Sequence, residues 1–158
     1  MGLGCKIFRP SIVVGAAPAT EGGKPSNLFL KFVWSLTSVA SLAGSRTIRI
    51  QGRPDARFQI VPIEYVAAAI VKITDCPAGS GTYHLVASNP PTQTDFLDML
   101  TRHLGVGGAR VTEDATFSNP SPLEARLARM LAPYRNYLTQ DVLFDDAFAR
   151  KWLDPTEI

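Results

Sequence analysis

The sequence lacks the short motifs that mark a self-sufficient nucleotide-using enzyme. No G-x-G-x-x-G turn is present, so no predicted strand-turn-helix offers backbone N–H groups to a pyrophosphate. The nearest glycine cluster, Gly105, Gly107 and Gly108, follows a predicted helix and is interpreted as its termination. A P-loop, a G-x-S-x-G nucleophile turn and an H-E-x-x-H zinc motif are absent as well.

A tyrosine followed four residues later by lysine is also absent. In such a pair the lysine lies one helical turn away and lowers the pKa of the phenol, so that tyrosine exchanges a proton with a carbonyl oxygen. The residues four positions after the tyrosines Tyr65, Tyr83, Tyr134 and Tyr137 are Ala69, Ala87, Leu138 and Asp141. No residue of this chain is therefore predicted to be catalytic, and its own residues leave open whether it belongs to an enzyme.

Cysteine and net charge are scarce too. Cys5 and Cys76 have no metal-ligand spacing, so we expect free thiols in a reducing cytoplasm and no bound metal. The net charge is only +2 and the basic residues are scattered, so no nucleic-acid partner is expected. No secretory signal is visible.

The apolar stretch 28–43 is short for a membrane span and contains Lys31. These features favour a buried or amphipathic helix over a membrane-associated one.

The pattern of apolar residues predicts strands that alternate with helices, and hence an α/β fold. Within residues 7–15, the run Ile12, Val13, Val14 ends at Gly15, which is typical of a strand buried on both faces of a parallel sheet. Further strands are predicted at 48–51, 58–61 and 82–87, and helices at 26–43, 62–74, 92–104, 121–132 and 145–153. We interpret the chain as a single domain, residues 1–158, from one end of a larger α/β structure.

Local signals predict where several helices begin. Thr92 with Asp95, and Ser121 with Glu124, have the spacing of a capping box. Pro62 is predicted to be the first residue of its helix, because its missing N–H needs no partner there.

The two histidines carry little chemistry by themselves. His103 lies near a predicted helix end, where the helix dipole favours it. For His84, on a predicted strand, a buried and hydrogen-bonded imidazole is favoured, and a substrate contact is the alternative.

Four stretches form a recognisable series: FRPSIVVG (8–15), FQIVPIEYVAAAI (58–70), TYHLVASNPPT (82–92) and YLTQDVLFDDAFARKWL (137–153). Together they resemble the C-terminal half of extended short-chain dehydrogenases/reductases. The most similar subgroup is that of the male-sterility or NAD-binding thioester reductases, which includes fatty acyl-CoA reductases. Glu64 stands where the family commonly has aspartate. In the family, the N-terminal half carries the glycine-rich loop, the ribose selector and the catalytic serine, tyrosine and lysine, and this half has no counterpart here.

The resemblance implies NAD or NADP as the cofactor of the parent protein. It predicts cofactor contacts at four consecutive residues, Pro10, Ser11, Ile12 and Val13. Val14 and Gly15 would face the substrate. Independently of the resemblance, Arg57 is a candidate to bind a substrate phosphate, because arginine forms bidentate hydrogen bonds to phosphate. The same residues also fit a plain buried strand and a solvated surface arginine. Because proline has no N–H for a ladder, Pro10 is expected at an irregular or edge point.

Three functions remain open at this stage. The chain is predicted to be the substrate-binding part of an NAD(P)-dependent oxidoreductase that acts on an acyl thioester, aldehyde or ketone. The first alternative is a part of a nucleotide-sugar epimerase or dehydratase, which uses the same scaffold. The second is a non-catalytic dimeric binding module. The expected partners are a small-molecule substrate and either the N-terminal Rossmann half or a second copy of the chain, because half a sheet leaves an open edge.

Overall fold

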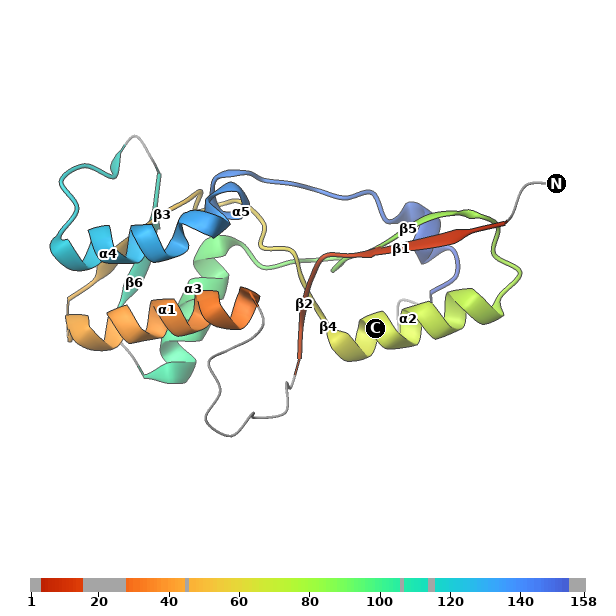
Figure 1. The fold of residues 1–158 in the computed structure, drawn as a ribbon, viewed down its shortest axis with the longest axis horizontal. Coiled ribbons are helices and arrows are strands. Elements are labelled where there is room, and N and C mark those ends of the chain that lie inside the picture. The colour runs from red at the N-terminus through yellow and green to blue at the C-terminus, as the bar shows by residue number, and fades with distance from the viewer. Residues whose placement is uncertain (1–3, 16–27, 45, 106, 114–115, 154–158) are drawn as a thin grey trace. The chain divides into compact units, whose positions relative to one another are not determined.

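The computed structural model describes residues 4–15, 28–44, 46–105, 107–113 and 116–153 (Figure 1). The chain divides into two compact units, each built from segments that are distant in sequence. Unit 1 comprises residues 1–18, 59–90 and 143–158, and unit 2 comprises residues 19–58 and 91–142. The predicted domain boundaries, 1–158 as a single substrate-binding domain, stay a prediction.

The described residues of unit 1 form two parallel strand pairs and two helices. β1 pairs with β5 from Lys6 opposite Gly81 to Pro10 opposite Leu85, and β2 pairs with β4 from Ile12 opposite Ile60. The elements are β1 (Lys6–Pro10), β2 (Ile12–Val14), β4 (Ile60–Pro62), α2 (Ile63–Asp75), β5 (Gly81–Leu85) and α6 (Ala147–Arg150). All described strand pairs are parallel, as predicted for the first strand.

The core of unit 1 forms around Tyr83, whose side chain is fully buried. Its ring stacks on Phe8 of β1 at 5.6 Å and on Phe148 of α6 at 4.7 Å between ring centroids. Its hydroxyl donates a hydrogen bond of 2.6 Å to the carbonyl oxygen of Gly79, so the one polar atom of this ring is satisfied. Buried residues of α2, among them Ile73, belong to the same cluster. The two strand pairs and both helices therefore share one apolar core.

The start of α2 differs by one residue from the prediction. Pro62 is the last residue of β4 and the N-cap of α2, with an extended backbone at φ −63° and ψ 144°. Its lack of an N–H is tolerated at either position, so local sequence does not separate them. Glu64 lies in the first turn of α2, where the helix dipole favours a carboxylate.

In unit 2, the described part of the chain forms one parallel strand pair and most of the helices. β3 pairs with β6, from Ile48 opposite Ala109 to Gln51 opposite Thr112, and α1 packs against α4. Its elements are α1 (Leu28–Ala43), β3 (Ile48–Gln51), α3 (Gln93–Leu104), β6 (Ala109–Thr112), α4 (Pro122–Leu131), the 3-10 helix η2 (Ala132–Tyr134) and α5 (Arg135–Thr139). The strand β6 was not predicted, whereas both capping boxes are confirmed at Thr92 and Ser121.

An aromatic cluster fills the core of unit 2. Phe32 of α1 lies 5.9 Å from Phe58 and 5.5 Å from Tyr134, and Phe58 lies 4.7 Å from Phe96, all between ring centroids. Phe32, Leu36, Val39 and Ala40 of α1 are buried, whereas Trp34 and Leu42 are exposed. α1 is therefore an amphipathic helix, one of the two forms that the sequence predicts. The predicted cap at Ser26 lies outside the described residues. No described helix is long and apolar enough to cross a membrane.

Candidate functional site

The chain changes its pairing partner at Pro10 and Ser11. Pro10 ends β1 opposite Leu85, and the Ser11 N–H still donates to the Leu85 carbonyl at 3.1 Å. The next N–H, of Ile12, donates to the carbonyl oxygen of Gln59 at 3.2 Å, and β2 then follows β4. Pro10 therefore lies at an irregular point, as expected from its missing N–H. Open parallel sheets bind ligands outside the carboxyl ends of their strands, at points where neighbouring strands separate.

Three polar side-chain atoms are buried around this divergence without a hydrogen-bond partner in the described residues. They are Ser11 Oγ, Gln59 Oε1 and His84 Nδ1. His84 pairs with Arg9, which precedes Ser11 by two positions, so His84 and Ser11 both lie near the carboxyl end of the β1–β5 pair. The carbonyl oxygen of Gln59, the residue just before β4, accepts the Ile12 N–H. An unpaired buried polar atom costs about 1–3 kcal/mol, so a group that pairs these atoms would be bound favourably.

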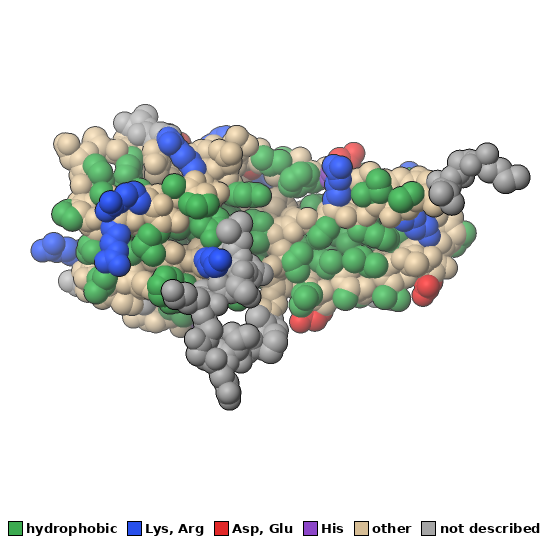
Figure 2. Space-filling model, viewed as in Figure 1, with side chains coloured by type: hydrophobic (Ala, Val, Ile, Leu, Met, Phe, Trp, Pro, Cys, Tyr) green, Lys and Arg blue, Asp and Glu red, His purple; other side chains and the backbone are tan. Residues whose placement is uncertain are grey.

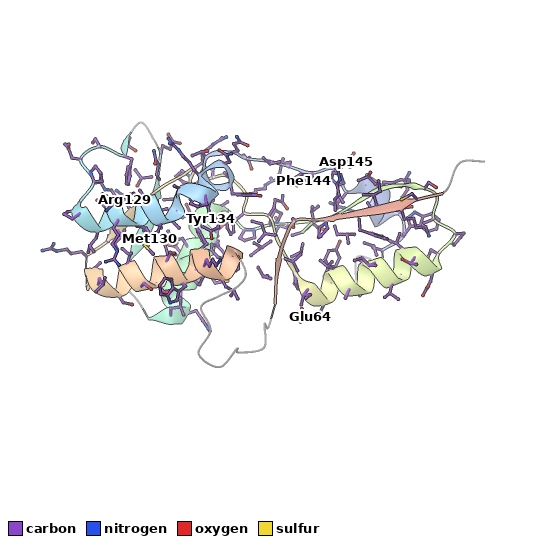
Figure 3. All side chains as sticks on the ribbon, viewed as in Figure 1. Glu64, Arg129, Met130, Tyr134, Phe144 and Asp145 are labelled. Atoms are coloured by element: carbon purple, nitrogen blue, oxygen red, sulfur yellow. The ribbon has the colours of Figure 1, made fainter. Side chains whose placement is uncertain are left out.

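His84 departs from its predicted environment. The favoured interpretation was a buried imidazole held by hydrogen bonds, but its Nδ1 has no partner among the described residues. The imidazole instead meets the ring of Phe144 edge to face, at 5.7 Å between centroids. Phe144 comes from the segment that leads into α6, where Figure 3 labels it beside Asp145. His84 Nδ1 is thus a buried polar atom whose hydrogen-bonding capacity is unused within the described residues.

Val14 and Gly15 follow the divergence directly. Val14 pairs with Pro62, and Gly15 then passes over the first residue of α2, Ile63. A Cβ atom at position 15 would contact the Cγ2 of Ile63 and lie 3.2 Å from its Cβ. The absence of a side chain at Gly15 therefore has a packing reason, which is independent of the predicted substrate contact.

Arg57 is held through its backbone and belongs to unit 2, whereas Pro10 to Gly15 belong to unit 1. Its N–H donates to Asp141 Oδ1 at 3.0 Å, and it forms an isolated antiparallel bridge with Thr92. The residue is exposed. The predicted phosphate contact would thus use an accessible guanidinium on a fixed backbone.

A charged group in unit 1 was missed by the sequence argument. Asp146 and Arg150 form an ion pair of 2.8 Å across one turn at α6. Burial raises the pKa of the half-buried Tyr65 phenol, and the negative charge of Asp146 raises it further. The i, i+4 spacing of Asp146 and Arg150 was the available signal for the pair. No sequence signal indicated that Asp146 lies close to Tyr65, which is about eighty positions earlier.

No group of three or more metal-ligating side chains occurs in the described part of the chain.

Comparison with known proteins gives a fold likeness. No family model and no curated protein matches the chain. Among solved structures, the chain is similar to the terminal R domain from the myxalamid PKS-NRPS biosynthetic pathway, with 22% identity and a TM-score of 0.58. That alignment covers 99% of this chain and 40% of the other. The likeness confirms the predicted fold class: α/β, with short parallel strands and several helices, as in part of a Rossmann-type fold.

Two further solved structures are similar at lower scores. A putative epimerase from Burkholderia cenocepacia J2315 is 18% identical, with a TM-score of 0.45, and the alignment covers 93% of this chain and 45% of that one. UDP-N-acetylglucosamine 4-epimerase from Bacillus cereus is 13% identical, with a TM-score of 0.47, and the alignment covers 92% and 46%. The chain thus spans less than half the length of each of these three proteins.

Proposed function

We propose that the chain is the substrate-binding, C-terminal part of a cytoplasmic NAD(P)-dependent oxidoreductase of the extended short-chain dehydrogenase kind. The parent would reduce an acyl thioester, an aldehyde or a ketone, and the thioester is favoured by the resemblance to the thioester reductases. The observation that carries the proposal is the strand divergence at Pro10 and Ser11, with buried, unpaired polar atoms around it. The fold likeness to the terminal R domain of the myxalamid PKS-NRPS pathway supports it.

The residues at the divergence fit a nicotinamide. A carboxamide has two N–H donors and one carbonyl acceptor, which complements the unpaired Gln59 Oε1 and the Ser11 hydroxyl. Ile12 and Val13 are half-buried and offer apolar surface to a ring. Pro10 to Val13 are thus proposed as one wall of the cofactor site. NAD(P)H would supply the hydride, and this chain would orient the ring and limit the access of water.

The substrate side is proposed at Val14, Gly15 and Arg57. The backbone hydrogen bond from Arg57 to Asp141 fixes the base of the arginine side chain. Its exposed guanidinium then suits the phosphate of coenzyme A or of a nucleotide-sugar. This feature also supports the alternative function, a nucleotide-sugar epimerase or dehydratase built on the same scaffold.

A dinucleotide-binding half is the proposed partner. Among the described residues, β1 pairs only with β5, so its second edge has free backbone groups. A parallel pair of strands is rarely stable alone, and further strands would complete the sheet. In the non-catalytic alternative, a second copy of the chain covers this edge instead.

The test is a hydride-transfer assay on the longest protein that the reading frame encodes around Met1. We expect oxidation of NADH or NADPH that depends on an acyl-CoA thioester. Ser11→Ala should raise the KM for the nicotinamide cofactor by about tenfold, the value of one lost hydrogen bond of about 1.4 kcal/mol. Ser88→Ala, at an exposed serine, is the matched control.

Turnover of a UDP-sugar without thioester reduction would select the epimerase or dehydratase alternative. Absence of both reactions, together with a dimer in sedimentation equilibrium, would replace the enzyme proposal with the dimeric binding module.

A further inference from the structure

The β3–β6 pair of unit 2 has one polar face and one apolar face. The register sets Arg49 opposite Arg110 and Gln51 opposite Thr112. Because side chains alternate between the two faces of a sheet, these four side chains lie on one face. The other face consists of buried apolar residues: Ile48, Ile50, Ala109 and Val111. The pair thus presents a polar face that the apolar core of unit 2 does not use.

Two arginines lie directly opposite each other on this face, and only one of them is neutralised. Neighbouring strands lie about 4.8 Å apart, so like charges at paired positions repel each other. Both carboxylate oxygens of Glu124 bind the Arg49 guanidinium, at 2.9 and 3.0 Å. Arg110 is exposed and forms no hydrogen bond or ion pair with a described residue. The polar face therefore carries an uncompensated positive charge at Arg110.

A buried hydroxyl adjoins this charge. Thr112 follows Arg110 by two positions on β6, so the two side chains are neighbours on the polar face. Thr112 is only 8% exposed, and its Oγ1 has no hydrogen-bond partner among the described residues. Leaving a buried hydroxyl unpaired costs free energy, so a ligand that accepts its proton would be bound favourably.

The charge of unit 2 as a whole also favours anions. By sequence, unit 2 carries more basic than acidic side chains, whereas unit 1 carries more acidic than basic ones. In the view of Figure 2, basic side chains gather over the part of unit 2 that contains α1 and α4. A positive potential of this kind raises the local concentration of anions.

We propose that the polar face of β3 and β6 binds the oxyanion of a phosphate group. Arg110 supplies a positive charge and parallel N–H donors, the Thr112 hydroxyl supplies a buried donor, and the half-buried Gln51 amide supplies a third group. A phosphate monoester has three terminal oxygens to accept from them. The site does not rest on the proposed oxidoreductase function, because it uses none of the residues proposed for the cofactor or the substrate.

Titration of the full, ¹⁵N-labelled chain with inorganic phosphate tests the site by nuclear magnetic resonance. We expect saturable shifts of the backbone amide signals of Gln51 and Thr112, and the same shifts with methyl phosphate. Acetate should bind more weakly, because it has only two oxygens. Sodium chloride at equal ionic strength is the control for a general salt effect.

Two substitutions test the roles of the side chains. Arg110→Gln should weaken phosphate binding at least about tenfold, the effect of one charge-assisted hydrogen bond. Arg102→Gln, the same change at an exposed position of α3, is the matched control. Thr112→Val keeps the shape of the side chain and should weaken phosphate binding without lowering stability in urea, because the lost hydroxyl has no partner. Lower stability with unchanged phosphate binding would contradict the proposal.

A further variant, Arg57→Gln, separates this site from the phosphate contact proposed above. We expect Arg57→Gln to retain the phosphate-dependent shifts, because Arg57 does not belong to β3 or β6. Loss of these shifts in Arg57→Gln, with full binding in Arg110→Gln, would overturn the proposal. So would equal losses in Arg102→Gln and Arg110→Gln, or a lack of saturable shifts at millimolar phosphate.

Discussion

Replacing Glu124 with glutamine should destabilise unit 2 in a pH-dependent way. The Glu124 carboxylate accepts four hydrogen bonds: three from Arg49, through its backbone N–H, Nε and Nη2, and one from the Ser121 N–H at 2.7 Å. It thus connects the outer edge of β3 to the N-terminus of α4. Glutamine has the same size, but it has no charge and only one acceptor oxygen.

The magnitude follows from the pKa of Glu124. The Arg49 guanidinium is the main cause that lowers this pKa from its ordinary 4.5 to about 2, against the opposing effect of burial. A difference of this size corresponds to about 3 kcal/mol of folding free energy for a fully shielded pair. Because 24% of the Arg49 side chain remains in solvent, screening reduces the expected contribution to about 1–2 kcal/mol.

The pH dependence has a definite sign. A carboxyl whose pKa is lower in the folded chain than in the unfolded chain stabilises the fold above the unfolded value. This stabilisation is lost as the pH falls from about 4.5 to about 2. The deficit of Glu124→Gln should therefore be complete at neutral pH and smaller at pH values near 3.

Urea unfolding at neutral and at acidic pH measures the effect. Far-UV circular dichroism follows the whole chain, and Trp34 fluorescence in a Trp152→Phe background follows unit 2. Glu113→Gln, the same change at an exposed residue, is the matched control. The reasoning is refuted if the two variants are equally stable at neutral pH, or if the Glu124→Gln deficit persists unchanged in acid.

Three further predictions concern the cap of α3, a close backbone approach and a tyrosine. Thr92→Ala should cost about 1 kcal/mol in urea unfolding and Thr92→Ser little, because serine keeps the capping box; equal losses would contradict this. Gly52→Ala should cost about 1–3 kcal/mol, because its Cβ would lie 3.0 Å from Val111 Cγ1 and 3.2 Å from the backbone oxygen of Leu138, whereas Gly79→Ala meets nothing within 4 Å and should be tolerated. Asp146→Asn should lower the pKa of Tyr65 in ultraviolet difference titration against a Tyr65→Phe reference; an unchanged pKa would remove Asp146 as a cause.

The features that the sequence predicted correctly depend on residues that are close together in the sequence. The capping boxes at Thr92 and Ser121 need only a three-residue spacing, and both are present. The helix stop at Gly105 needs one glycine with a left-handed backbone, and its φ is 61°. The position of Pro10 at an irregular point follows from its missing N–H alone.

The features that were missed depend on residues far apart in the chain. β6 is a short strand, Ala109–Thr112, whose alternating polar and apolar residues gave a weak signal until its partner β3 was known. Arg49 and Glu124 are 75 positions apart, so nothing local connects them. The change of strand partner at Ser11 likewise needs both β4 and β5 in place.

The three-segment construction of unit 1 has a consequence for protein synthesis. A ribosome completes β1 and β5 well before residues 143–158, which supply α6. The ring of Phe148 that stacks on Tyr83 therefore arrives last, although Tyr83 is fully buried in the finished fold. Until then the nascent chain carries an apolar surface that its own residues cannot yet cover, and such surfaces recruit chaperones or associate with each other.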